Sequence, residues 1–249
     1  MLDLPNKDTL ERPPLELVVC QVRHEPVSSV ADAGLLPMFQ QRLGHGFDRL
    51  EAVTSAPHGI PPGLAPASVI STTGWRLTNE EGWIITLTTE SFALECTKYT
   101  RWTTFRELIG SLATLVSETY SPRLTQRIGL RYVDRFAREG SAFPAQWSGL
   151  LHPAVLGFGA DEVLAGATLA TQTISELLIE GLRANIRGSI ASDTTPNGYS
   201  FLLDTDCFEE RGRVFDTVAI GGVVDRLHEL NLRLFQHTIT PSLYSEIHG

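Results

Sequence analysis

The sequence contains very little lysine and very little cysteine. Of its 20 cationic side chains only Lys7 and Lys98 are lysines, and its three cysteines, Cys20, Cys96 and Cys207, form no C-x-x-C pair. An odd number of widely spaced cysteines argues against a disulfide framework and against a structural zinc site. We expect three reduced thiols in or near the core, because free cysteine behaves as a small buried hydrophobe.

Long apolar runs are also missing. No stretch reaches the ~18 consecutive apolar residues that a membrane span requires. The first residues are polar and lack the apolar region of a secretory signal. These absences predict a cytoplasmic, bacterial-type protein without a membrane partner. The net charge of −9 argues against bulk nucleic-acid binding, which needs a basic surface.

The familiar catalytic and cofactor motifs are absent as well. The chain has no phosphate-binding G-x-x-x-x-G-K-[ST] or G-x-G-x-x-G loop, no G-x-S-x-G elbow and no H-E-x-x-H zinc motif. Two acidic groups are weak candidates for a metal, Asp225 with His228 on a helix and Asp204 with Asp206 on a strand, but solvated side chains explain both more simply. We therefore predict no catalytic residue, no metal and no cofactor.

Hydrophobic periodicity predicts an α+β fold of mostly antiparallel sheets, with helices packed on one face. Apolar residues three and four positions apart predict helices over 35–50, from about 104 to 121 and over 217–237, the last capped by Asp216. The strands are expected over 15–22, 75–78, 83–89, 92–97, 124–136, 168–180, 182–190 and 199–206. Four prolines and two glycines make 55–68 a long loop.

These elements suggest two related-looking halves. Residues 1–136 form an N-terminal β-α-β-β-β-α-β unit, and residues 167–249 form a C-terminal antiparallel sheet with a long helix. Glycine and proline punctuate the segment 137–166, which is therefore predicted to connect the halves.

Arginine is concentrated on one predicted strand. Five arginines and one acid lie between residues 123 and 138, a local charge of +4 in an acidic chain. Alternation places Arg127, Arg131 and Arg135 on one face, and Arg183 and Arg187 form a weaker stripe on another strand. These five arginines are the predicted ligand-binding residues, because the guanidinium fork suits carboxylate or phosphate groups. The alternative is that they pair with acids on adjacent strands, such as Glu16 or Glu95.

Two segments carry a family resemblance. The strand Arg127-Ile-Gly-Leu-Arg131-Tyr-Val-Asp134-Arg135 resembles the motif R-x-G-L-R-Y-x-N-R of a sporadically distributed family of uncharacterised bacterial proteins, with Asp134 where asparagine is commoner. The opening strand from Pro14 to Arg23 and the ending around His228 and Ile239 are similar to the same family. The resemblance supports the fold and implies an accessory protein encoded near mobile or natural-product gene clusters.

The functional expectation that follows is a non-catalytic accessory protein that binds a peptide or protein. A concrete form is the binding of a precursor peptide in a ribosomal-peptide natural-product pathway, by addition of a strand to an exposed sheet edge. One alternative is an enzyme with a motif-less active site between the two halves, built from groups such as His228, Asp225, Asp204 and Asp206. Another is an immunity or antitoxin-type inhibitor whose acidic surface masks a basic toxin. Open sheet edges also allow a homo-oligomer.

Overall fold

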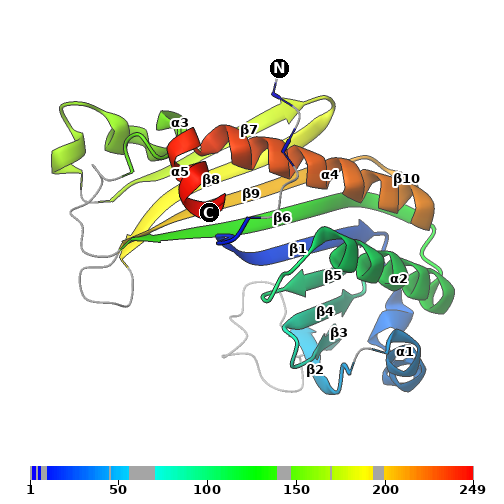
Figure 1. Ribbon diagram of the computed structural model, residues 1–249. Coiled ribbons are helices and arrows are strands. Elements are labelled where there is room, and N and C mark those ends of the chain that lie inside the picture. The colour runs from blue at the N-terminus through cyan, green and yellow to red at the C-terminus, as the bar shows by residue number, and fades with distance from the viewer. Residues whose placement is uncertain are drawn as a thin grey trace. The chain divides into compact units, whose positions relative to one another are not determined.

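The strands of the computed structural model form one antiparallel sheet, accompanied by five α helices (Figure 1). The structure describes residues 2–3, 5–6, 10–44, 46–55, 71–138, 147–168, 170–192 and 199–248. Along the main path of the sheet the strands follow the order β2-β3-β4-β5-β1-β6-β9-β8-β7, and β10 pairs with β6. The predicted α+β class is confirmed.

The chain divides into two compact units of discontinuous segments. The first unit contains Met1–Val18, Leu130–Glu209 and Asp225–Gly249, and the second contains Val19–Gly129 and Glu210–Val224. Three elements contribute to both units: β1 (Leu15–His24), β6 (Leu124–Arg138) and α4 (Thr217–Thr238). This division differs from the predicted one at 137–166, because long strands and a long helix run through both units.

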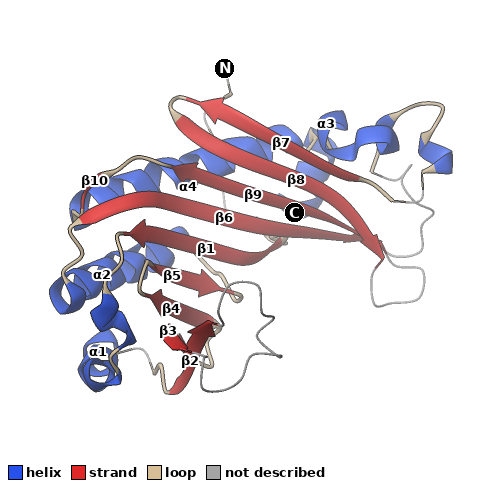
Figure 2. Cartoon of the chain, turned by 180° about the vertical axis from the view of Figure 1, so that it is seen from behind, coloured by secondary structure: helices blue, strands red, loops and turns tan. Residues whose placement is uncertain are grey.

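The first unit packs helices on one side of its strands (Figure 2). Besides its parts of β1, β6 and α4 it contains α3 (Pro153–Leu156), β7 (Gln172–Ile179), β8 (Leu182–Ser192), β9 (Tyr199–Glu209) and α5 (Pro241–His248). Leu227, Leu230 and Leu234 form the buried stripe of α4. The side-chain Nδ2 of Asn231 donates to the backbone oxygen of Leu130 at 3.1 Å, which joins helix and sheet inside the core.

The second unit has the same layering, with one helix face against its strands. Its further elements are α1 (Leu36–Leu43), β2 (Arg49–Ser55), β3 (Ser71–Thr78), β4 (Trp83–Thr88), β5 (Ser91–Cys96), α2 (Trp102–Tyr120) and β10 (Arg213–Val214). Phe105 of α2 packs against Trp83 with ring centroids 5.9 Å apart. Asp216 caps α4 as predicted, since its Oδ1 accepts a hydrogen bond from the Ala219 amide at 2.7 Å.

Several element boundaries differ from the predictions. The helix expected over 35–50 ends at Leu43, because Gly44 takes the left-handed φ of 64° and closes the last turn. Residues 49–50, predicted as the end of that helix, open strand β2 instead. The short α5 was not predicted, and the predicted loop 55–68 lies outside the described residues except for Ser55.

All three cysteines are free and buried, as expected. Burial raises the pKa of the Cys20 thiol to about 12. None of the described helices combines the length and the apolar character needed to cross a membrane.

Asp134 is an unusual member of the first unit's core. Only 4% of this residue is exposed, and alternation along β6 places its side chain on the helix-covered face with Tyr132 and Phe136. Removal of the carboxyl from water raises the pKa of Asp134 to about 8. The folded state therefore holds a proton at neutral pH that the unfolded chain releases.

We expect the free energy of unfolding to fall as pH rises from about 4 to about 8, by at most about 1.4 kcal/mol per pH unit from this one group. The sign follows because the folded state binds the extra proton, so stability is lost as pH rises toward the raised pKa. Asp134→Asn removes this loss and stabilises the protein most at pH 8, as urea unfolding at several pH values can measure. The control is Asp225→Asn, an exposed position on α4. Parallel wild-type and Asp134→Asn curves would contradict the prediction.

Candidate functional site

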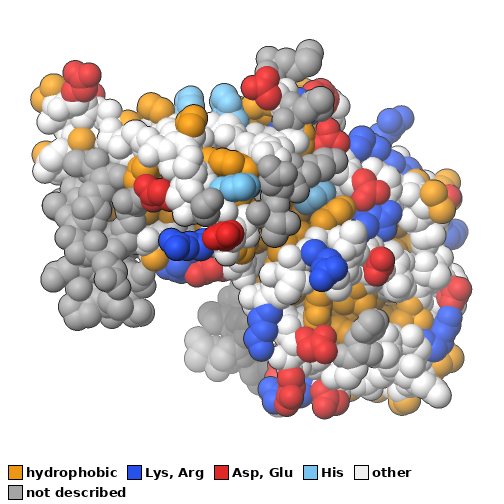
Figure 3. Space-filling view, viewed as in Figure 1, with side chains coloured by type: hydrophobic (Ala, Val, Ile, Leu, Met, Phe, Trp, Pro, Cys, Tyr) orange, Lys and Arg blue, Asp and Glu red, His pale blue; other side chains and the backbone are white. Residues whose placement is uncertain are grey.

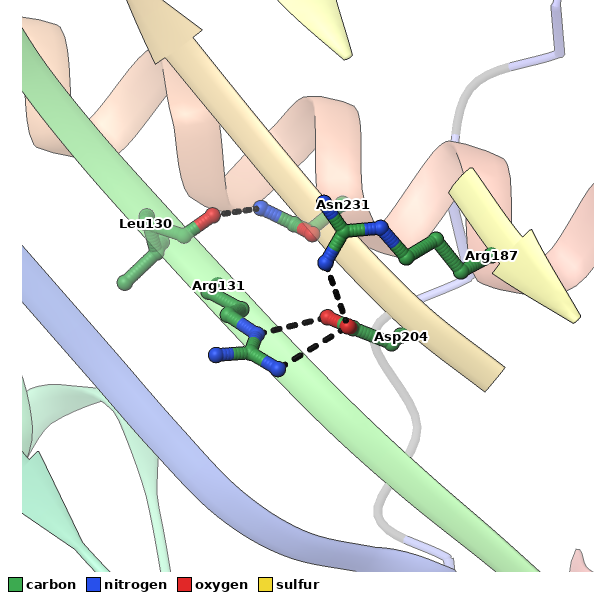
Figure 4. Close-up of polar contacts among 5 residues, drawn as sticks. All are labelled: Leu130, Arg131, Arg187, Asp204 and Asn231. Carbon is green, nitrogen blue, oxygen red and sulfur yellow. Dashed lines mark hydrogen bonds and ion pairs between the residues drawn. The ribbon is translucent and has the colours of Figure 1, made fainter. Parts of the chain in front are cut away.

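Asp204 lies between two arginines on the face of the first unit's sheet that α4 does not cover (Figure 4). Arg131 Nε donates to Asp204 Oδ1 at 2.6 Å, and Arg131 Nη2 donates to Asp204 Oδ2 at 2.9 Å. Arg187 Nη1 lies 3.4 Å from the same Oδ2. One carboxylate thus joins side chains of three consecutive strands, β6, β9 and β8.

Strand alternation and register bring these groups together. On β9, Leu203 and Thr205 are buried on the helix side, so the side chain of Asp204 points to the opposite face of the sheet. Arg187 is the direct cross-strand partner of Asp204, and directly opposed residues share a face. We call this surface the open face. It is defined by Arg131 and Arg135 of β6, Asp204 and Asp206 of β9, Arg183 and Arg187 of β8, Glu176 of β7 and Glu16 of β1.

The Arg131–Asp204 contact is the strongest ion pair of the open face. Its geometry is the bidentate fork that arginine forms with carboxylates. The side chain of Asp204 is 15% exposed, against 43% for Arg131. The hydrogen bond to Asp204 raises the pKa of Arg131, so this guanidinium is positively charged at neutral pH.

The other predicted binding arginines also face acids or lie elsewhere. Arg135 Nε lies 2.8 Å from Glu16, and Arg183 Nη2 lies 3.4 Å from Glu176. Arg127 belongs to the second unit, where its guanidinium lies over Gly129 and near buried Cys20. The structure therefore brings together four of the five predicted arginines, each paired with a carboxylate.

Charge on the open face is balanced. It carries four arginines and four acids among the described residues, so the local +4 of the arginine-rich segment does not become a basic groove there. On the helix-bearing side drawn in Figure 3, basic and acidic side chains are likewise interspersed. The arginines of this face pair with acids of neighbouring strands, which is the alternative that the sequence left open.

Strand β7 ends the hydrogen-bonded path of the sheet and has one free edge among the described strands. A two-residue turn, Glu180-Gly181, joins it to β8, with Ile179 directly opposite Leu182. In such hairpins the pair that flanks the turn is hydrogen-bonded, and bonded pairs then alternate along the ladder. The bond from the Ile190 amide to the Thr171 oxygen, 3.2 Å long, fits this alternation.

This hairpin geometry determines which backbone groups point away from the sheet. Thr173, Ser175 and Leu177 turn their N–H and C=O groups toward β8. Residues 172, 174, 176 and 178 turn theirs toward the free edge. Two of these outward-facing residues carry exposed apolar side chains on the open face: Ile174 is 66% exposed and Leu178 is 74% exposed. The sequence predicts a strand in this segment but gives no sign that the strand lies at an edge.

The groups considered for a motif-less active site do not converge. His228 Nδ1 lies 2.7 Å from the hydroxyl oxygen of Tyr132, on the helix-covered side of the sheet. Asp204 and Asp206 lie on the open face, and Asp225 is exposed on α4. Within the described residues, no three histidine, cysteine, aspartate or glutamate side chains are grouped as a metal site requires.

The Asp204 pair lends itself to a double-mutant cycle. For Asp204→Asn and Arg131→Gln we expect a coupling free energy of about 1 kcal/mol, because the pair is bidentate and partly buried. The matched control cycle is Glu176→Gln with Arg183→Gln, a half-exposed pair for which we expect less than about 0.5 kcal/mol. Urea unfolding of the seven proteins, with the wild type common to both cycles, measures both values. Equal coupling in the two cycles would contradict the assignment of Asp204 as the main ion-pair centre.

Comparisons with known proteins do not indicate a function for this site. No protein-family model matches the chain, and no curated protein matches it. The first unit thus presents a charge-balanced open face and, beside it, a strand edge that no other described strand pairs with and that carries two exposed apolar side chains.

Proposed function

We propose that the chain is a non-catalytic accessory protein that binds an extended peptide along the free edge of β7. The supporting observation is this edge itself, where alternate backbone groups point outward beside exposed Ile174 and Leu178. A peptide that adds a strand here satisfies the outward N–H and C=O groups and covers both apolar side chains. Main-chain bonding of this kind needs no catalytic group.

The weak protection of this edge supports a binding role. Edge strands commonly carry lysine, proline or a bulge, which prevent accidental pairing with other chains. Strand β7 contains neither lysine nor proline, its register with β8 is unbroken, and its one charged side chain is Glu176. By contrast β2, at the opposite end of the strand order, has a register shift between Val53 and Thr54. A weakly protected edge is expected where strand pairing is the function.

The partner that fits this edge is a chain without stable structure of its own. Its backbone groups are free to pair, and it orders only on binding. The unmodified leader of a ribosomally made precursor peptide has this chemistry, and the family resemblance implies an accessory protein near natural-product genes. We propose such a precursor peptide as the natural ligand, held in extended form for modifying enzymes.

The two alternative functions have weaker support. An immunity or antitoxin-type inhibitor rests on the net charge of −9 alone. The enzyme alternative requires groups that lie on opposite faces of the sheet, His228 on one and Asp204 on the other. Neither is supported by a feature comparable to the β7 edge.

Proline at position 174 tests strand addition directly. The Ile174 amide points outward, so Ile174→Pro removes a donor for an added strand and leaves the bonds to β8 in place. Peptides selected from a random 12-residue library against the wild type are expected to bind with micromolar Kd in fluorescence anisotropy. We expect Ile174→Pro to weaken this binding at least about tenfold, the cost of one or two lost hydrogen bonds.

Two controls separate the backbone from the side chain. Ile174→Ala keeps the outward amide and removes only apolar contact, so its loss of affinity should be smaller than that of Ile174→Pro. Thermal unfolding of each variant verifies that the hairpin persists. If no library peptide binds the wild type better than it binds Ile174→Pro, the proposed function is wrong.

A further inference from the structure

We propose that the β7 edge selects peptides by the alternating pattern apolar–any–basic–any–apolar. This inference rests on the proposed function and adds the class of sequence that the edge accepts. The selecting side chains are Ile174, Glu176 and Leu178, at the three outward-facing positions nearest the β7–β8 turn.

The pattern follows from antiparallel strand geometry. Residues whose backbone groups point to the free edge form the hydrogen-bonded pairs with an added antiparallel strand. Side chains that are directly opposite in such pairs lie on the same face and in contact. Every second side chain of the peptide therefore lies on the open face, next to Ile174, Glu176 and Leu178 in turn. The intervening peptide side chains point to the other side and contribute no contact with these three residues.

The two outer positions favour apolar partners. Ile174 is 66% exposed and Leu178 is 74% exposed, so each has most of its side chain available for burial. An apolar peptide side chain beside each residue removes this surface from water, and a charged one does not. The spacing of four residues between Ile174 and Leu178 sets the same spacing between the two apolar peptide positions.

The middle position favours a basic partner. Glu176 lies between the apolar pair on the open face, and its side chain is 57% exposed. Arg183 approaches Glu176 to 3.4 Å from β8, the side away from the free edge. A carboxylate accepts several hydrogen bonds, so a lysine or arginine arriving from the free edge can bind Glu176 alongside Arg183. An acidic peptide residue at this position meets a like charge directly opposite.

A second copy of the chain meets a charge conflict in the register that pairs both apolar residues. The two-fold register that places Ile174 opposite Leu178 of a second copy also places Glu176 opposite itself. Directly opposed like charges destabilise an antiparallel pair. A basic residue in the middle of a separate peptide avoids this conflict, which makes a foreign peptide the preferred occupant.

Three synthetic peptides test the pattern by fluorescence anisotropy. The first is a fluorescein-labelled nonapeptide with the core Leu-Thr-Lys-Thr-Leu between Ser-Thr and Thr-Ser ends. The second has glutamate in place of lysine, and the third exchanges the lysine with its neighbouring threonine. We expect the first to bind the wild type about fivefold or more tightly than either of the others. Glu176→Arg should reverse the preference between lysine and glutamate peptides, while Glu176→Gln should reduce it.

The outcomes distinguish this inference from the proposed function. Equal affinity of the wild type for the lysine and glutamate peptides, with binding still lost in Ile174→Pro, overturns the pattern and leaves strand addition standing. Failure of both the designed and the library-selected peptides to bind overturns the function itself. A wild-type dimer in sedimentation analysis that Ile174→Pro dissociates identifies a second copy as the occupant and also overturns the inference.

Discussion

The two-residue turn between β7 and β8 is the constraint on which the candidate site depends. Glu180 and Gly181 both take positive φ, 53° and 81°, which matches the right-handed twist of a tight hairpin. Glutamate rarely adopts this conformation, but Arg233 of α4 donates two hydrogen bonds to its carboxylate, at 3.0 and 3.2 Å. These bonds lower the pKa of Glu180. The helix thus holds the turn that sets the register of the edge strand.

Register determines the chemistry of both faces. A slip by one residue would turn every β7 side chain to the opposite face. Ile174 and Leu178 would then face the helix side, and Glu176 would leave Arg183. The register is also unbroken between β8 and β9, where Arg187 lies opposite Asp204. The β7 edge is therefore a consequence of this hairpin geometry, and the β8–β9 register adds the Asp204 cluster of the open face.

Local patterns in the sequence predict most elements but not which strands are neighbours. The hairpin after Gly181 and the shared face of Arg131 and Arg135 follow from alternation and turn chemistry. Glu16 was anticipated as an acidic partner. Asp204 as the partner of Arg131 was not, because 73 residues separate them and periodicity does not specify strand order. For the same reason the sequence shows that β7 is a strand but not that it lies at an edge.

Charge balance is the reason that the proposed binding is placed at the β7 edge and not on the open face. An anion on the open face would have to compete with Asp204 for Arg131 and Arg187, and separation of a partly buried bidentate pair costs more than an exposed contact returns. A peptide at the β7 edge displaces no such pair, because its backbone bonds to groups that no described strand occupies. The paired charges nevertheless matter to such a peptide. They keep the neighbouring face polar, so exposed apolar surface on β7 is concentrated at Ile174 and Leu178, and in the proposed complex those two side chains and Glu176 set the position of the peptide.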